Sequence, residues 1–485
     1  MKHDYQPAAT AHRWWILVVV CMAMFMGVLD STSVYAALPV IALDLGFALG
    51  EVQWVITAYG VAIGGLLLLG GRLADHMGRG RTFMTAVGVF AAASLACGFS
   101  PSSEALIAAR VVQGVGAAVM TPAGMSVLMQ VFPDGPDRNK ALGIWGGLGG
   151  TGATVGLLLG GVLTDWFGWA WIFFSNVPVC LVVMVLCPIL FPPSARNTQR
   201  LDLPGALLAT GALVLTLLAV FHIAAHGVSP LAVMSCAGAL ITSALFVVVE
   251  LRSPAPLVPM RIFASRTLVG GNLVIVIAGI AVDGLLIVVT LYAQQVLGFS
   301  ALQFGLTMAI MTVTSVLGVV AGQHVVTRAG FRLVATWGMI LLTSSCLLLS
   351  QLSVDGTLAK DLLLGLIVFG SGMGAAFVAG QIAALTGVAE HDSGLAAGIA
   401  ETGFAVGTTL GAGLASAIVI GVATRATAGA PTASELTGGL AVALYVLAAL
   451  AAIGALCAAV LLRTPPVAKV RSASSKSAIS RSAAS

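Results

Sequence analysis

The segment GRLADHMGRGR, residues 71–81, carries four charged side chains, Arg72, Asp75, Arg79 and Arg81, within eleven positions. The stretches before and after it, GVAIGGLLLLG and FMTAVGVFAAASLACGF, are almost purely apolar. Only 8% of the 485 residues are charged, so this concentration needs a physical reason. A short polar connection between two helices in a hydrocarbon environment supplies one, because charged side chains are costly inside hydrocarbon and are accommodated at its edge.

The composition of the whole chain is that of a membrane protein. Hydrophobic residues make up 59% of it and charged residues 8%, whereas soluble domains carry about 25% charged residues. A helical span needs about 20 largely apolar residues, and the apolar runs here lack the alternation of a membrane β-barrel. The sequence predicts an all-α polytopic protein with 14 transmembrane helices, near residues 14–36, 52–71, 83–100, 104–130, 141–163, 170–191, 204–224, 229–250, 267–292, 302–326, 333–353, 361–385, 395–422 and 437–462.

The distribution of lysine and arginine predicts the orientation, because these residues are enriched in cytoplasmic loops. With a cytoplasmic N-terminus, all but three of the 22 Lys and Arg residues lie on the cytoplasmic side. Lys360 and Arg425 fall outside, and Arg110 falls within a span. We therefore expect a multi-pass protein with both termini in the cytoplasm, and the high Ala and Gly content, which fits a GC-rich bacterial genome, favours a bacterial inner (plasma) membrane.

Several classes of function find no support in the sequence. The net charge of +4 and the dispersed basic residues argue against a nucleic-acid partner. The seven cysteines stand singly in apolar runs, and no GxxxxGK[ST] phosphate loop is present. No connection is long enough for a soluble catalytic domain, so we expect neither an enzyme nor a bound cofactor. The Ser- and Ala-rich residues 463–485 are interpreted as a disordered cytoplasmic tail.

The segment 71–81 resembles the loop signature of the major facilitator superfamily, which is roughly G-x-L-A-D-x-x-G-R-x-R. The matching residues are Gly71, Leu73, Ala74, Asp75, Gly78, Arg79 and Arg81. The resemblance implies two related six-helix bundles, with this loop as a latch that favours one conformational state. Asp75 can serve such a latch by pairing with an arginine or capping a helix N-terminus. A weaker echo, AGQHVVTRAGFRL, follows the tenth apolar run when Gly330 is set against Gly78.

Further stretches resemble the fourteen-span drug:proton antiporters of that superfamily. GVLDSTSVYAALPVI is similar to L-D-x-T-x-V-x-x-A-L-P, with Tyr35 in place of the usual Asn, and ALIAARVVQGVGAAVMTPA is similar to R-x-x-Q-G-x-G-x-A. GGTGATVGLLLGGVL resembles G-x-x-x-G-P-x-x-G-G, with Leu157 at the proline position. LYAQQVLGFSALQFGL and FFSNVPV resemble the same branch. The glycines that match the third signature are Gly152, Gly156, Gly160 and Gly161.

The resemblance implies a domain organisation with an extra helix pair between the two bundles. The expected parts are a cytoplasmic N-terminus (1–13), a six-helix bundle (14–191), a linker with two additional helices (192–266; helices about 204–224 and 229–250), a second six-helix bundle (267–462) and the tail (463–485).

Four ionisable residues lie deep inside predicted spans: Asp30, Arg110, Asp283 and Glu401. An ionised side chain at the centre of a bilayer costs at least about 2.5–3.5 kcal/mol, so each should face the bundle interior or a water-filled cavity. Asp30 is the first candidate for the acid that couples transport to protons. The resemblance implies that Arg110, with Gln113 one helical turn away, organises proton transfer without titrating. The alternative for all of them is a structural polar anchor between helices.

Asp283 and Glu401 depart from the family pattern and are candidates for acids that attract a cationic substrate, or for a second coupling site. A hydrogen bond between helices explains either residue equally well. The glycines at 152, 156 and 160 form a stripe that permits close helix packing. A tentative substrate cavity is lined by Met26, Tyr35, Trp54, Tyr59, Trp145, Tyr292 and Glu401, although such residues often face lipid or neighbouring helices.

The sequence thus predicts a secondary transporter that exports amphipathic drugs or related small molecules by proton antiport, through alternating access. The expected partners are protons, the lipid bilayer and a lipophilic or cationic small molecule, and the expected working unit is a monomer. The proton gradient takes the place of a cofactor. Two alternatives remain on the same scaffold, a dedicated metabolite exporter and a proton-coupled uptake permease. A non-transporting membrane sensor or enzyme ranks lower, and a passive channel ranks last.

Overall fold

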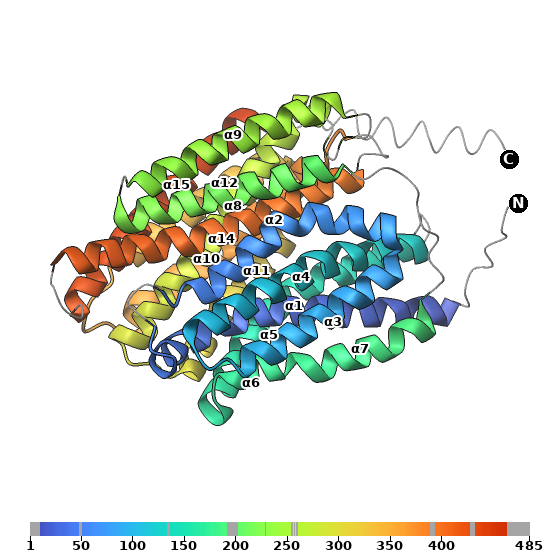
Figure 1. Ribbon diagram of the computed structural model, residues 1–485. Helices are drawn as coiled ribbons and strands as arrows, with labels where there is room; N and C mark the ends of the chain where they lie inside the picture. Colours follow the sequence, from blue (N-terminus) through green and yellow to red (C-terminus); the bar gives the residue numbers. More distant parts are fainter. Residues whose placement is uncertain are drawn as a thin grey trace, which may run out of the picture.

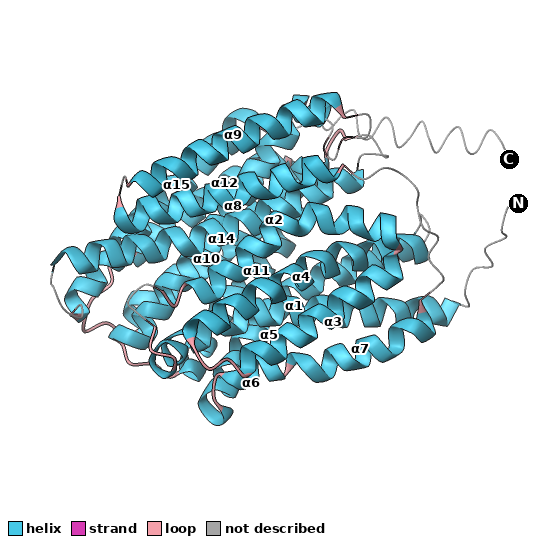
Figure 2. Cartoon of the chain, in the orientation of Figure 1, coloured by secondary structure: helices cyan, strands magenta, loops and turns pink. Residues whose placement is uncertain are grey.

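The computed structural model describes residues 10–47, 51–132, 136–191, 202–227, 229–253, 256, 258, 260–388, 393–426 and 432–462. Within this part of the chain, the regular structure is entirely helical (Figure 2). The helices are α1 (Thr10–Asp44), α2 (Trp54–Met77), α3 (Arg79–Gly98), α4 (Ser103–Val131), α5 (Pro136–Phe167), α6 (Ala170–Phe174), α7 (Asn176–Leu190), α8 (Leu203–His226), α9 (Pro230–Arg252), η1 (Met260–Ala264), α10 (Arg266–Leu291), η2 (Tyr292–Val296), α11 (Ala301–Ala329), α12 (Phe331–Leu349), η3 (Leu358–Leu362), α13 (Leu363–Leu385), α14 (Ser393–Ala426) and α15 (Ala433–Leu461).

The helices agree with an all-helical membrane protein. Among the described residues, 11 helices are long and apolar enough to cross a bilayer. Shorter apolar segments lie in α2, α5 and α8, where some residues are not described. The count of fourteen spans therefore stays a prediction. The first nine residues, the linker residues 192–201 and the predicted disordered tail 463–485 lie outside the described part of the chain.

The structure differs from the predicted elements in three places. The segment 71–81 is almost wholly helical, because α2 continues to Met77 and α3 begins at Arg79, so the connection is Gly78 alone. Helix α1 extends past the predicted end at 36, through Pro39, to Asp44. The predicted run 170–191 is divided at Ser175 into α6 and α7. In each case the hydropathy pattern locates the apolar run but does not report where the helical hydrogen bonds end.

The two halves of the chain share an unusual turn. Gly78 joins α2 to α3 with φ +99°, and Gly330 joins α11 to α12 with φ +84°. Only glycine adopts such a φ without strain. The one-residue corner therefore explains why glycine stands at both places in the partial sequence repeat.

The helices form two groups (Figure 1). In the first group, α1 packs on α4, α5 and α7, and α4 packs on α2 and α3. In the second group, α10 packs on α13, α14 and α15, and α12 packs on α13 and α15. The groups meet through α5 with α11 and through α2 with α14. Helix α8 packs on α2, α14 and α9, so it contacts both groups.

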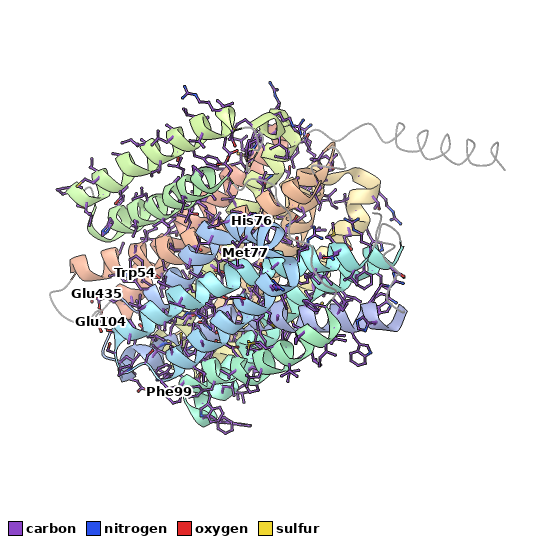
Figure 3. All side chains as sticks on the ribbon, turned by 45° about the vertical axis from the view of Figure 1, so that its right-hand side comes forward. Trp54, His76, Met77, Phe99, Glu104 and Glu435 are labelled. Carbon is purple, nitrogen blue, oxygen red and sulfur yellow. The ribbon has the colours of Figure 1, made fainter. Side chains whose placement is uncertain are left out.

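The largest hydrophobic core that the groups share lies at one end of the bundle, and a smaller cluster, in which Leu69 of α2 packs against buried residues of α8, α10 and α14, also joins them. We call the end where α1 begins the proximal end and the end where α1 finishes the distal end; Figure 3 shows Trp54, Glu104 and Glu435 at the distal end. One core joins the distal halves of α1–α5 to α10–α15, whereas a second core contains residues of α1–α5 and α7 alone. Polar contacts also join the groups distally. Gln294 Nε2 donates to the Ala36 carbonyl at 3.1 Å, and the Leu302 amide donates to Asp165 Oδ2 at 3.2 Å.

Replacing Gly160 by alanine should destabilise the protein. A Cβ at Gly160 would lie 2.5 Å from the Ser33 carbonyl oxygen, so α5 must move away from α1. Overpacking of this kind costs about 1–3 kcal/mol. We expect the variant to melt at a lower temperature than the parent protein in detergent. Size-exclusion chromatography of heated samples measures the melting temperature. Gly398→Ala is the matched control, because a Cβ there meets nothing within 4 Å. Equal melting of the two variants would contradict the packing argument.

Candidate functional site

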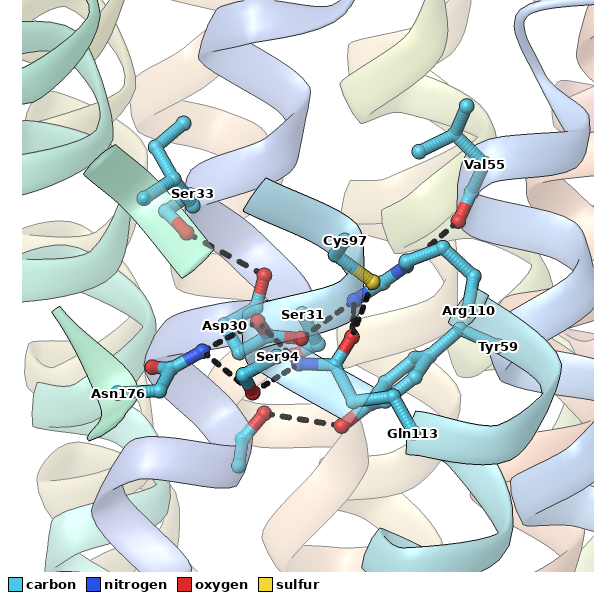
Figure 4. A network of polar contacts seen from close by, with 12 residues as sticks. Asp30, Ser31, Ser33, Val55, Tyr59, Ser94, Cys97, Arg110, Gln113 and Asn176 are labelled. Atoms are coloured by element: carbon cyan, nitrogen blue, oxygen red, sulfur yellow. Dashed lines mark hydrogen bonds and ion pairs between the residues drawn. The ribbon is translucent and has the colours of Figure 1, made fainter. Parts of the chain in front are cut away.

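A cluster of polar side chains is completely enclosed within the first helix group (Figure 4). Its members are Asp30 of α1, Ser94 of α3, Arg110 and Gln113 of α4, and Asn176 of α7, and each is 0% exposed. Polar groups buried to this degree are tolerated only when they are hydrogen-bonded to one another. The cluster is therefore a single network whose members depend on one another.

The carboxylate of Asp30 is the centre of the network. Its Oδ2 accepts a hydrogen bond from Arg110 Nη1 at 2.6 Å. Its Oδ1 accepts from Gln113 Nε2 at 2.9 Å and from Asn176 Nδ2 at 2.7 Å. Three donors thus replace the water that an ionised carboxylate loses on burial, and one of them supplies the compensating positive charge.

The guanidinium of Arg110 is held from several directions. Nη1 also donates to Gln113 Oε1 at 2.6 Å, and Nε donates to the Val55 carbonyl of α2 at 2.8 Å. The guanidinium lies over the Tyr59 ring, 4.0 Å from its centroid. Arginine suits this place because its planar, permanently charged group can stack on a ring and donate in several directions at once.

Ser94 and Cys97 complete the network. Ser94 Oγ accepts from Gln113 Nε2 at 2.8 Å and from Asn176 Nδ2 at 3.4 Å. Cys97 Sγ lies 3.6 Å from Gln113 Oε1. The sequence analysis did not select Ser94, Asn176 or Cys97. The stretch FFSNVPV contained the one available signal for Asn176, an amide inside an apolar run, whereas Ser94 had none.

Asp283 lies apart from this network, at the junction of the two helix groups. Its carboxyl lies beside the hydroxyl of Tyr35, which is five residues beyond Asp30 on α1 and buried. Asp283 belongs to α10, so this contact joins the first group to the second. It lies in the same region as the Gln294–Ala36 hydrogen bond.

The structure does not bring Glu401 to Asp283. Helices α10 and α14 run parallel, because Val276 packs on Gly407 and Ile280 packs on Gly411. Asp283 is therefore level with residues near 414, about 13 residues or roughly 20 Å along α14 from Glu401. The side chain of Glu401 is exposed.

The predicted latch is described in part. Arg79 Nη1 donates to the Ser126 carbonyl of α4 at 3.2 Å, and Arg81 is exposed. Gly71 lies inside α2, and Gly78 forms the corner between α2 and α3. The side chain of Asp75 lies outside the described part of the structure.

The glycine stripe of α5 faces α1. Gly152 meets Val28, Gly156 meets Thr32, and Gly160 meets Ser33. Gly161 lies on the other side of the helix, where the backbone of Ala301 of α11 approaches it. The stripe therefore holds α1, and with it Asp30, close to α5.

The residues predicted to line a cavity are mostly packed in the two cores. Tyr59 and Trp145 belong to the proximal core, Tyr35 and Tyr292 belong to the distal one, and Met26 is buried outside both. Tyr59 lies under Arg110, and Trp54 is half-buried at the start of α2. A role in substrate binding stays a prediction for all of them. Among the described residues, no group of three His, Cys, Asp or Glu side chains is placed to bind a metal ion.

Removing Arg110 alone should destabilise the protein strongly. Arg110→Leu leaves Asp30 buried without its counter-charge, which typically costs about 3–5 kcal/mol. The double variant Asp30→Leu/Arg110→Leu should recover most of the lost stability, because no uncompensated charge remains. Thermal melting in detergent measures both. A double variant as unstable as the single one would contradict a charge-pair origin of the effect.

Comparison with known proteins agrees with this architecture. The family model of the Major Facilitator Superfamily matches residues 20–412 and 271–484. The chain is similar to a puromycin resistance protein of Streptomyces alboniger, with 36% identity over 84% of this chain and 82% of that protein. It is also similar to a cephamycin export protein of Amycolatopsis lactamdurans (42%; 60% and 61% of the two chains) and to a tetracenomycin C resistance and export protein of Streptomyces glaucescens (31%; 84% and 78%).

Solved structures show the same fold at low sequence identity. A transporter of the POT family, PepTSo, aligns with a TM-score of 0.66 and 15% identity over 94% of this chain and 98% of its own. A bacterial homologue of the lysosomal transporter Spinster aligns with a TM-score of 0.65 and 15% identity over 94% and 98%. By sequence and by fold, this chain belongs to the Major Facilitator Superfamily, a family of membrane transporters and not of enzymes.

Proposed function

We propose that this transporter exports antibiotics or related amphipathic compounds by proton antiport. The names of its relatives, which specify resistance to puromycin and export of cephamycin and tetracenomycin C, support the direction and the substrate class. The observation that carries the proton coupling is the Asp30–Arg110 pair. A fully buried carboxylate with an arginine partner is costly in a membrane, and such groups commonly mark proton relays.

In this proposal the protein has fourteen spans, with both termini in the cytoplasm. Two six-helix bundles, α1–α7 and α10–α15, rock about a central site, and the α8–α9 pair lies beside both. The distal contacts between the bundles then correspond to closure on the outer side. In this proposal, the described conformation is the one in which an exported compound is loaded from the cytoplasm.

Protonation of Asp30 is the proposed coupling step. The ion pair with Arg110 is stable only while the carboxyl is charged, so a proton on Asp30 frees the guanidinium to take a different partner. The rearranged bundle then favours the outward-open state. Movement of one charge through 100 mV supplies about 2.3 kcal/mol, before any pH gradient is counted. That exceeds the roughly 1.4 kcal/mol that changes a two-state population tenfold.

Asp283 and Glu401 are proposed to attract cationic substrates. For Glu401, the exposed side chain supports this role, because an incoming compound can reach it. Asp283 supports it by its position at the bundle junction beside Tyr35. An alternative assignment of either acid as the coupling site is tested by the same experiment as Asp30.

Proton flux in energised inverted vesicles tests the proposal. Addition of puromycin or a lipophilic cation should release protons from vesicles that contain the parent protein, and Asp30→Asn should abolish the release. Asp283→Asn and Glu401→Gln are controls that keep the Asp30 network intact. Flux that survives in Asp30→Asn but disappears in one control would move the coupling to that acid. Proton flux with a single compound only would favour a dedicated exporter. Transport of the compound in the direction opposite to export would favour an uptake permease.

Glu401→Gln should weaken binding of cationic compounds selectively. A hydrogen bond to a charged group contributes about 1.5–3 kcal/mol, so KM for a lipophilic cation should rise about tenfold or more. A neutral compound of similar size should keep its KM. Transport assays with a cationic and a neutral substrate in the same vesicles measure both. An equal change for the two would exclude charge recognition by Glu401.

A further inference from the structure

We propose that Asn176 is an amide switch that serves both protonation states of Asp30. It donates to the carboxylate when Asp30 is charged and, after a half-turn of its amide, accepts a hydrogen bond from the carboxylic acid. The inference rests on the proposed proton coupling and adds to it the residue that stabilises the proton-bound state within an enclosed network.

Every side-chain atom that contacts the Asp30 carboxyl is a donor. Arg110 Nη1, Gln113 Nε2 and Asn176 Nδ2 all direct N–H groups at it. This arrangement suits a carboxylate, which only accepts hydrogen bonds. A carboxylic acid also has an O–H to donate, and at 0% exposure the nearest acceptors are on the side chains that enclose it. One of the three neighbours must therefore change its role when a proton arrives.

Two of the three neighbours are unsuitable. Arg110 has no acceptor atom. Gln113 is occupied at both ends, because its Oε1 receives Arg110 Nη1 at 2.6 Å and its Nε2 donates to Ser94 as well as to Asp30. Turning the Gln113 amide would place its NH₂ group against the guanidinium. Asn176 differs, because its Oδ1 is buried and makes no hydrogen bond with any described residue.

The switch needs no change of shape. The two ends of an amide are nearly equal in size, and the terminal torsion of asparagine has roughly two-fold preferences. In either orientation one end of the Asn176 amide is paired with Asp30 and the other is not. The orientation is thus decided by the charge on Asp30, since each state of the carboxyl repels the wrong end.

The proton has one favourable place on the carboxyl. Oδ2 faces the guanidinium, so a proton from the gradient bonds to Oδ1, and the new O–H is directed at Asn176. The other ionisable groups that interact with Asp30 are Tyr59 of α2, Cys97 of α3 and Cys180 of α7, besides Arg110 of α4. Asp283 of α10 faces Tyr35 instead. In the described parts of α5, α6 and α11, no ionisable group contacts Asp30.

Infrared difference spectroscopy of the full-length protein during a pH titration tests the switch. The carboxylic-acid band of Asp30 is assigned by its loss in Asp30→Asn, and the amide band of Asn176 by its loss in Asn176→Leu. We expect the Asn176 carbonyl band to shift to lower frequency at the same pH at which Asp30 takes up its proton, because the carbonyl oxygen then gains a hydrogen bond.

Substitutions should move the Asp30 titration midpoint in a defined direction. Asn176→Leu removes a donor to the charged form and an acceptor to the neutral form, and the charged interaction is the stronger, so the midpoint should rise by about one pH unit. Asn176→Asp should raise it further, because two adjacent carboxyls retain a shared proton. Asn272→Leu is the matched control. Asn272 also has a buried Oδ1 without a partner among the described residues, but its Nδ2 donates to the Leu268 carbonyl in the second helix group, and its loss should leave the midpoint unchanged.

The outcomes separate this inference from the proposed function. An Asp30 band that titrates with a midpoint unaffected by Asn176→Leu and Asn176→Asp overturns the switch and leaves proton coupling at Asp30 intact. A midpoint that shifts while the amide band stays still also overturns it, because Asn176 then acts as a fixed donor. Failure of Asp30 to titrate in any of these proteins overturns the proposed coupling at Asp30 together with the switch.

Discussion

The energetic constraint on this protein is the burial of an ionised carboxylate and an ionised guanidinium in contact with each other. Asp30 and Arg110 gain from their contact because Gln113, Asn176 and the Val55 carbonyl satisfy most of their other donors and acceptors, although Arg110 Nη2 has no hydrogen-bond partner among the described residues. These groups come from four different helices, so the charge pair determines how α1, α2, α4 and α7 are placed relative to one another. The glycine stripe of α5 then supports α1 from the opposite side.

The location of this network within one helix group has a mechanical meaning. The proposed rotation of α1–α7 against α10–α15 leaves its distances unchanged, so the proposed protonation of Asp30 does not require the network to be pulled apart by rocking. Tyr35 and Asp283 stand in the opposite situation, because they belong to different groups and must separate when the distal contacts open. In the proposed mechanism, the residue that takes up the proton and the residue at the junction of the groups thus lie on neighbouring turns of the same helix, α1.

The sequence predicted the charged residues that are energetically costly inside a membrane and the long apolar runs that form helices. Asp30, Arg110 and Gln113 stand out because charged groups are rare in apolar runs, and the structure places the three in contact. Asn176 and Ser94 are neutral and short, and similar residues occur in many spans without consequence, so their roles emerge only from the packing of α3 and α7 against α1. The helical continuation through 71–77 was missed because charge marks the edge of the apolar environment and not the end of a helix. The locations of the aromatic side chains were the hardest to predict, because an aromatic ring can pack in a hydrophobic core as well as line a cavity.

The two hydrophobic cores draw on different parts of the chain, and this difference has a consequence for folding during synthesis. The proximal core draws only on residues up to Cys187, so all of its members have been synthesised before α8 begins. The distal core needs α10–α15 and is completed only after these helices have been synthesised. Domains generally fold as units in the order of synthesis. The first helix group can therefore pack its proximal core in the membrane before the helices of the second group are synthesised. The distal core forms when those helices are added.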